Sequence, residues 1–207
     1  MIESTFPITQ EIALTSEQIA RASYHLSTTR DALVELVAGL LPSQWNFRPT
    51  TESWSIAENV EHLVLIESRV QAIIRNMENA PEAISTARQI EMDAIILREV
   101  PNRSTKLKAP EPVCPQGRWS GEEALQCFFA GRERTIQLLA APLLRGRVRP
   151  HPLFGPWDGY QWLLAAGLHT ERHTEQIREA RAHPMFPSAT GVATIPLFSY
   201  WGSPCAI

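Results

Sequence analysis

Four stretches of this sequence begin with the same short signal for the start of a helix. Thr15, Ser55, Ser120 and Asp158 are each followed three residues later by Glu or Gln. In such a capping box the two side chains bond backbone N–H groups that the first helical turn leaves without partners. Apolar residues then recur three and four positions apart, as in helices with one buried face. The pattern predicts an all-α chain dominated by four long helices.

Gly and Pro residues mark where these helices should end. We expect the first to end near Gly39 and Pro42, the second near Met77, the third before Pro142 and the fourth near Ala182. Between these limits, the segments that connect the predicted helices differ in length.

The long connections are rich in Pro and Gly. A shorter helix is expected between Pro81 and Val100, and 101–119 and 146–157 are predicted to be loops. No alternating run flanked by a hairpin turn occurs, so no strand pair is expected. Loops of this length are often functional or mobile, so both could form walls or a lid of a pocket. The alternative is that both loops only wrap the helices.

Length and composition exclude several classes of protein. A chain of 207 residues with net charge −3 is expected to form one domain and not to bind nucleic acid. No uncharged apolar run reaches the length of a membrane span. The N-terminus carries acids and no basic region, so a secretory signal is not expected and we predict a cytoplasmic protein.

The C-terminal segment differs from the rest of the chain. We divide the sequence into a helical domain at 1–183 and a tail at 184–207. The tail has no Asp, Glu, Lys or Arg and is rich in prolines and aromatic residues, unlike a solvated disordered segment. We expect it to dock on its own domain, with a partner subunit as the alternative.

The fourth predicted helix carries a histidine pair that could bind a metal ion. His169 and His173 are four residues apart, so both imidazoles lie on one helix face and can reach one ion. The segment is not the H-E-x-x-H motif of zinc proteases, in which a general-base Glu directly follows the first His, because Thr170 occupies that position. Glu171, one residue further on, is expected to face solvent. The same face should carry Trp162, Ala165, Ala166, Gln176 and Ala180.

A third ligand would have to come from another helix. His62, two turns into the second helix, is the leading candidate, and His25 on the first helix is a rival. Glu58 lies one turn before His62, where it could orient the ring or take a proton, or it could serve only as the capping-box acid. His151 and His183 are interpreted as structural.

Two segments resemble the signatures of the DinB-like (YfiT-like) superfamily. These are Trp54-Ser-Ile-Ala-Glu58-Asn-Val-Glu-His62-Leu63 and His169-x-x-x-His173-x-x-Gln176-Ile177, and the resemblance covers about residues 15–182. It implies a four-helix bundle, with a short extra helix and long Pro-rich loops here, and a divalent metal held by His62, His169 and His173. Glu58 and Gln176 are the expected supporting residues around those ligands. The resemblance also implies a homodimer.

Characterised members of that superfamily include thiol S-transferases that use bacillithiol or mycothiol, and a mycothiol-dependent maleylpyruvate isomerase. Three neutral imidazoles leave the ion's charge uncompensated and a coordination position open, which is typical of catalytic zinc sites. Imidazole suits zinc and nickel equally. No protein nucleophile is well placed, since Cys127 belongs to an apolar helical run and Cys114 to a loop.

We therefore expect a metal-dependent enzyme that transfers a low-molecular-weight thiol to an electrophilic small molecule. The alternatives are a metal-dependent hydrolase and a non-catalytic, stress-associated bundle that binds metal or ligand. Arg69, Arg132 and Arg134 could neutralise an acidic substrate, but arginines on bundle helices usually face solvent, so none is assigned to the site.

Overall fold

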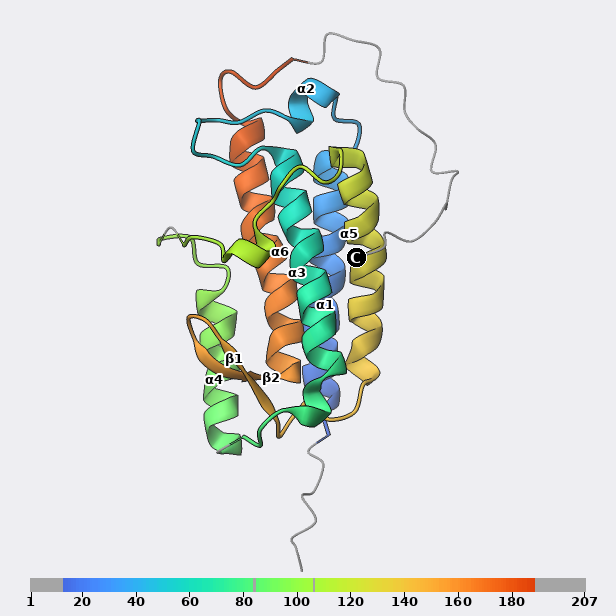
Figure 1. Ribbon diagram of the computed structural model, residues 1–207, viewed down its shortest axis with the longest axis vertical. Coiled ribbons are helices and arrows are strands. Elements are labelled where there is room, and N and C mark those ends of the chain that lie inside the picture. The colour runs from blue at the N-terminus through green and yellow to red at the C-terminus, as the bar shows by residue number, and fades with distance from the viewer. Residues whose placement is uncertain (1–12, 84, 106, 189–207) are drawn as a thin grey trace, which may run out of the picture.

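Four long helices lie side by side and form the body of the molecule, as Figure 1 shows for the computed structural model. The structure describes residues 13–83, 85–105 and 107–188. The four helices are α1 (Ser16–Val37), α3 (Ile56–Arg75), α5 (Gly121–Gln137) and α6 (Gly159–Arg181). The predicted all-α, four-helix architecture is confirmed.

Each of the four predicted capping boxes is formed. The side chains of Thr15, Ser55, Ser120 and Asp158 accept from the backbone N–H three residues on, and the Glu or Gln there accepts from the cap's own N–H. Short 3-10 turns, η1 (Met77–Asn79) after α3 and η3 (Leu138–Ala140) after α5, occupy the remainder of the predicted spans. The helix starts were thus predicted to the residue.

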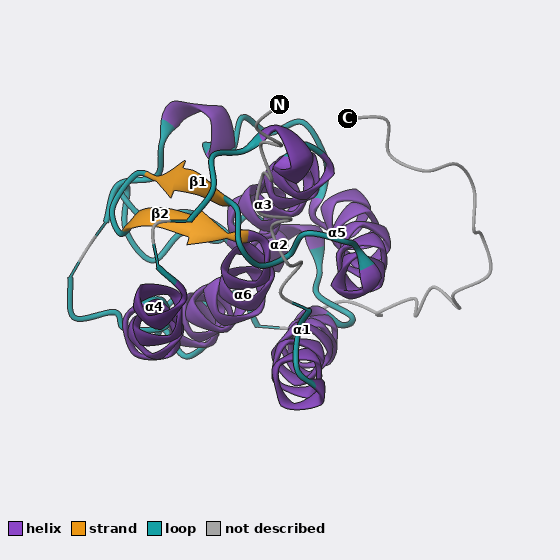
Figure 2. Ribbon diagram, turned by 90° about the horizontal axis from the view of Figure 1, so that it is seen from below, coloured by secondary structure: helices purple, strands orange, loops and turns teal. Residues whose placement is uncertain are grey.

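The shorter elements lie at the ends and on one side of the bundle. Viewed along the helices, α4 and the two strands lie outside the four-helix body, beside α6 (Figure 2). The expected extra helix between 81 and 100 is therefore present. These elements are α2 (Pro42–Trp45), α4 (Thr86–Glu99), η2 (Glu111–Val113), β1 (Val148–His151) and β2 (Gly155–Asp158).

The strand pair contradicts the prediction of a loop at 146–157. β1 and β2 pair antiparallel over four residues each, with Pro150 opposite Pro156. The prolines remove backbone donors from the ladder and break the alternation by which a hairpin is recognised. The turn is closed instead by the His151 ring, whose Nδ1 accepts from the backbone N–H groups of Leu153 and Phe154 at 3.2 and 3.3 Å.

The bundle interior consists of two apolar clusters with a polar layer between them. One cluster includes Leu26, Val70, Ile74 and Leu163, and the other includes Leu33, Val60, Phe128 and Ile177. Each long helix contributes a buried polar residue to a network at the level between the clusters. These residues are Thr29, Glu67, Arg132 and Thr170.

Arg132 is the centre of this polar layer, and its predicted solvent-facing position is wrong. It has no exposed surface. Its Nε and Nη2 donate to Glu67 at 3.0 and 2.6 Å, and other N–H groups donate to Thr29, Thr170 and backbone carbonyls of α1 and α6. A charge within a helix normally indicates a surface position, but these acceptors compensate the burial of this one.

The first residues of the tail contact the bundle. The Phe186 ring packs edge-on against Phe47 with centroids 5.3 Å apart, and Gln44 donates to the Pro187 carbonyl at 2.8 Å. Residues 189–207, to which most of the docking prediction refers, lie outside the described residues.

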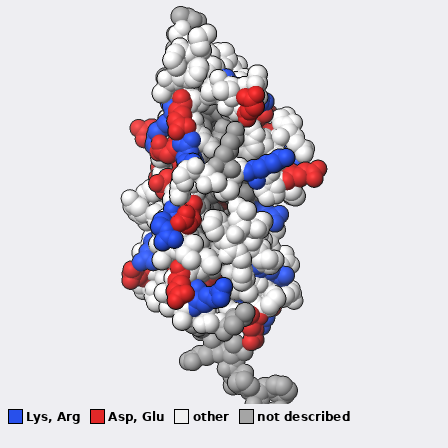
Figure 3. Space-filling view, turned by 90° about the vertical axis from the view of Figure 1, so that its left-hand side faces the viewer, with Lys and Arg blue, Asp and Glu red and all other residues white. Residues whose placement is uncertain are grey.

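The surface carries charges of both signs. On the side bearing α4, basic and acidic side chains are interspersed and do not gather into a patch of one sign (Figure 3). Within the described part of the chain, no helix combines the length and apolar character needed to cross a bilayer.

Candidate metal centre

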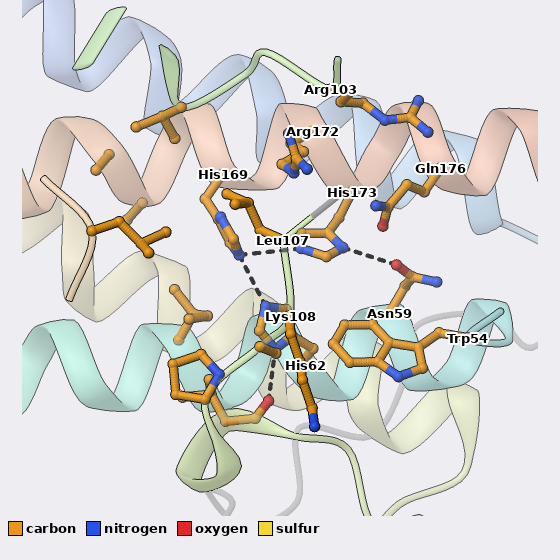
Figure 4. Close-up of a pocket in the computed structure, with 18 of the residues that line it drawn as sticks. Trp54, Asn59, His62, Arg103, Leu107, Lys108, His169, Arg172, His173 and Gln176 are labelled. Atoms are coloured by element: carbon orange, nitrogen blue, oxygen red, sulfur yellow. Dashed lines mark hydrogen bonds between the residues drawn. The ribbon is translucent and has the colours of Figure 1, made fainter. Parts of the chain in front are cut away.

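Three imidazoles from two helices converge at one point beside α3 and α6 (Figure 4). The Nε2 atom of His169 lies 2.9 Å from that of His62 and 3.1 Å from that of His173. His62 and His173 are buried and His169 is half-buried. Ligand atoms of all three residues lie within 4.8 Å of one another. The predicted convergence of these three side chains is therefore confirmed.

The opposite nitrogens of two of these rings are fixed by oxygen acceptors. His62 Nδ1 donates to the Val113 carbonyl at 2.6 Å, and His173 Nδ1 donates to the Asn59 side-chain oxygen at 2.8 Å. The Asn59 amide is oriented in turn by its own donation to the Ser55 carbonyl at 2.9 Å. With protons on Nδ1, the Nε2 lone pairs of His62 and His173 point toward the common centre.

Burial keeps the three rings uncharged. It lowers the pKa of His62, and it lowers the pKa of His169 and His173 well below the usual histidine value. The neighbouring imidazoles and Arg172 lower the pKa of the latter two further, while a side-chain hydrogen bond with Gln176 acts against this shift at His173. Neutral imidazole is the form that binds metal ions.

This set of donors fits a divalent cation better than it fits a hydrogen-bond network. The single Nε2 proton that His169 could supply can be donated to only one of its two neighbours, and the other Nε2 would be left unpaired. An unpaired polar atom at a buried position is costly. A divalent ion would satisfy all three nitrogens, and imidazole donors suit zinc and nickel.

The histidine cluster opens into a cavity of about 1060 Å³. The Trp54 ring lies against His62 and His173, with centroid separations of 5.0 and 6.0 Å. All five residues predicted to share the α6 face with the histidines line this cavity. Both long connectors contribute walls, as expected for pocket-forming loops. Their contributions include Leu107, Pro110, Val113, His151, Leu153 and Phe154.

Comparison with known proteins agrees with this geometry. The family model of the DinB superfamily matches residues 25–177. The chain belongs to the DinB superfamily. A Bacillus subtilis relative, the uncharacterized protein YuaE, is 29% identical over 146 residues, which cover 69% of this chain and 86% of that protein. No solved structure matches.

The two supporting residues expected in this DinB-superfamily site have different positions. Gln176 lines the cavity beside His173 (Figure 4). The carboxylate of Glu58 instead accepts from the Ser55 backbone N–H at 2.7 Å and pairs with Arg48. An acid in the third helical position reaches back to the cap, so its side chain points away from the next turn and from His62.

The remaining histidines lie outside the cluster. His25, the rival ligand, lines a separate groove between α1 and α6 together with Tyr24 and Glu171. Glu171 is exposed, as predicted. The ring of His183 accepts from the Met185 backbone N–H at 3.2 Å, a local structural contact.

One residue that sequence reasoning missed is Glu61, the neighbour of His62. Its buried carboxylate accepts from the backbone N–H groups of Gln116, Gly117 and Arg118 at 2.9, 2.8 and 3.3 Å. These bonds fasten the 101–119 connector to α3 and hold the Val113 carbonyl over the His62 ring. The available signal was an acid one helical turn from the apolar residues Ala57, Val64 and Leu65.

Proposed function

We propose that this protein binds one divalent metal ion through His62, His169 and His173 and transfers a low-molecular-weight thiol to an electrophilic small molecule. Zinc and nickel both suit the site. The observation that carries the proposal is the convergence of three neutral imidazole nitrogens at the wall of a large cavity. Three protein donors leave a coordination position for an exogenous ligand, as in catalytic zinc sites.

The protein's own residues would orient and enclose the reactants. Val113 and Asn59 fix the rings of His62 and His173, so the ligand atoms do not have to reorganise. Aromatic walls would hold an apolar electrophile and exclude water. Bound at this site, a divalent ion would act as a Lewis acid that lowers the pKa of a coordinated thiol.

The absence of a protein nucleophile favours an exogenous thiol. Among the described residues that line the cavity there is no cysteine. The Cys114 thiol is directed at the carbonyls of Ala109 and Pro110, 3.5 and 3.4 Å away, and Cys127 is buried in the second apolar cluster.

Metal analysis of purified protein tests the site. The wild type should contain about one zinc or nickel ion per chain, and His169→Ala should lose it because two imidazoles bind a divalent ion far more weakly than three. His25→Ala is the matched control, since it removes a histidine outside the cluster and should retain the ion. Retention of the ion by His169→Ala would contradict the proposal.

The reaction type is tested with two probe substrates. With N-acetylcysteine and 1-chloro-2,4-dinitrobenzene, a carbon–sulfur bond forms, chloride leaves and the thiol proton passes to buffer. Metal-loaded wild type should accelerate this reaction and His169→Ala should not. Thiol-independent hydrolysis of 4-nitrophenyl acetate, without thiol transfer, would instead support the hydrolase.

A further inference from the structure

Arg172 is a buried cation that lines the cavity without an acidic partner. It lies on α6 between His169 and His173 (Figure 4), and only 8% of its surface is exposed. Its Nη1 donates to the Asn102 carbonyl, and its Nη2 donates to the Thr105 carbonyl at 3.2 Å. No carboxylate among the described residues pairs with it.

The other buried arginines of the described chain are compensated. Arg132 donates to Glu67, and Arg145 donates to Asp93 and Asp158. A buried charge without a counter-charge is costly, and peptide carbonyls supply only partial charges. A guanidinium has five N–H donors, so donors remain available on Arg172 after its two bonds to the loop.

The other charged residues of the cavity wall do not supply the missing negative charge. Glu179 is engaged by Arg103 through bonds of 2.8 and 2.6 Å, and Glu99 is paired with Arg98. Lys108 and Arg69 line the same cavity and form no ion pair within the described parts of the chain, and Glu52, a third acid of the wall, does not pair with Arg172. Four cationic side chains of the described wall, those of Arg69, Arg103, Lys108 and Arg172, therefore face only three carboxylates.

We propose that Arg172 forms an anion subsite that binds the carboxylate of a substrate whose apolar part lies against Trp54 and Trp162. The subsite deepens the proposed function, on which it rests for its place beside the reacting centre. Guanidinium–carboxylate hydrogen bonds are charge-assisted and strong where water is excluded. The competing explanation is that Arg172 only ties the loop at Asn102 and Thr105 to α6.

Binding of a matched pair of probes to metal-free protein tests the subsite. The probes are 3-phenylpropionate and its uncharged amide, 3-phenylpropanamide, and binding is followed by tryptophan fluorescence and calorimetry. Wild-type protein should bind the acid about tenfold more tightly than the amide. In Arg172→Gln the two probes should bind with about equal affinity, because the glutamine side chain carries no charge. Equal binding of both probes by the wild type would overturn the proposal.

Two further variants separate ligand binding from a structural role. Arg178→Gln removes the same charge from the outer face of α6, where Arg178 pairs with Glu175, and should keep the full preference. Arg172→Lys keeps the charge without the fork of donors and should keep part of the preference. If Arg172→Gln, shown by circular dichroism to be folded, still prefers the acid as the wild type does, Arg172 only fastens the loop.

The binding test of the Arg172 subsite and the metal analysis can succeed or fail independently. If the protein binds metal but shows no preference for the acid, the subsite proposal fails and the metal proposal stands. If it prefers the acid but binds no metal, the metal proposal fails and the subsite stands. The carboxylate could belong to the thiol or to the electrophile. In zinc-loaded protein, competition between 3-phenylpropionate and N-acetylcysteine would assign the subsite to the thiol, and simultaneous binding would assign it to the electrophile.

Discussion

Two buried polar clusters share α6 but differ in whether their groups find complementary partners within the protein. Thr170 belongs to the polar layer inside the bundle, while the adjacent His169 faces the cavity. In the polar layer, Arg132 finds acceptors on all three other long helices, including the carboxylate of Glu67 on α3. In the histidine cluster, three Nε2 atoms face one another, and the one proton that His169 could supply there satisfies only one of its two neighbours.

This difference separates groups that stabilise the fold from groups that are available to a ligand. In the polar layer the charges of Arg132 and Glu67 neutralise each other, although Glu67 Oε2 has no hydrogen-bond partner, and removing one residue leaves the other buried and unpaired. An unsaturated set at a cavity wall costs stability until something binds to it. The following predictions test this division, beginning with the largest effect.

The largest effect is expected at the polar layer. Arg132→Met should lower the free energy of unfolding by about 3–5 kcal/mol, because it leaves the Glu67 carboxylate buried without its counter-charge. Urea denaturation measures the loss.

Two other variants check the origin of that loss. Replacing both partners, as Arg132→Met with Glu67→Leu, should cost less than Arg132→Met alone, since no charge remains buried. Arg178→Met, on the surface of α6, should cost less than about 0.5 kcal/mol. If Arg132→Met proves no more harmful than this surface change, the polar layer does not hold the bundle together.

An intermediate effect is expected at the residue that orients His173. Asn59→Ala should weaken metal binding about 10–100-fold, because the ring loses the acceptor that fixes its tautomer and direction. Competition with a chromophoric chelator measures the affinity. The neighbouring Glu58→Ala should lose about 1 kcal/mol of stability through its cap and leave metal affinity unchanged. If Glu58→Ala weakened metal binding and Asn59→Ala did not, Glu58 rather than Asn59 would support the metal ligands.

The smallest effect concerns pH and His151. Burial and the nearby Arg69 lower the pKa of this histidine to about 4, and its Nδ1 accepts two backbone N–H groups in the hairpin turn. The unfolded chain, with a histidine pKa of about 6.5, binds more protons than the native state between these values, so stability falls as pH falls through this range.

The expected loss from His151 between pH 7 and pH 5 is about 1 kcal/mol, after allowance for its partial exposure. His151→Phe preserves the stacking on Trp157 and should reduce the pH dependence of unfolding by that amount. Denaturation curves at both pH values give the change in unfolding free energy for each protein. The other titrating groups contribute equally in both proteins, so the difference between the two changes is due to His151. Identical pH dependence in the two proteins would refute this account.

The sequence was informative wherever the controlling interactions are local. Capping boxes fix helix starts through contacts three residues apart, so Ser55 and Asp158 could be identified without tertiary information. The spacing of His169 and His173 likewise follows from helix geometry. The third member, His62, was placed by its helix face and by family resemblance.

Long-range contacts explain what the sequence did not reveal. The acceptor for His62 is a backbone carbonyl 51 residues away, which no side-chain pattern encodes. Arg132 was misplaced because its compensation comes from three other helices, and Arg172 was overlooked because the absence of a partner cannot be seen in a sequence. The hairpin was missed because Pro150 and Pro156 oppose each other across it.

The position of Arg132 also determines how the histidines come to be aligned. One guanidinium cross-links α1, α3 and α6 to α5. Axial sliding of any helix by one turn would break several of these bonds at once. The register between His62 on α3 and the pair on α6 is therefore held by bonds within the protein, at a level of the bundle separate from the imidazoles themselves.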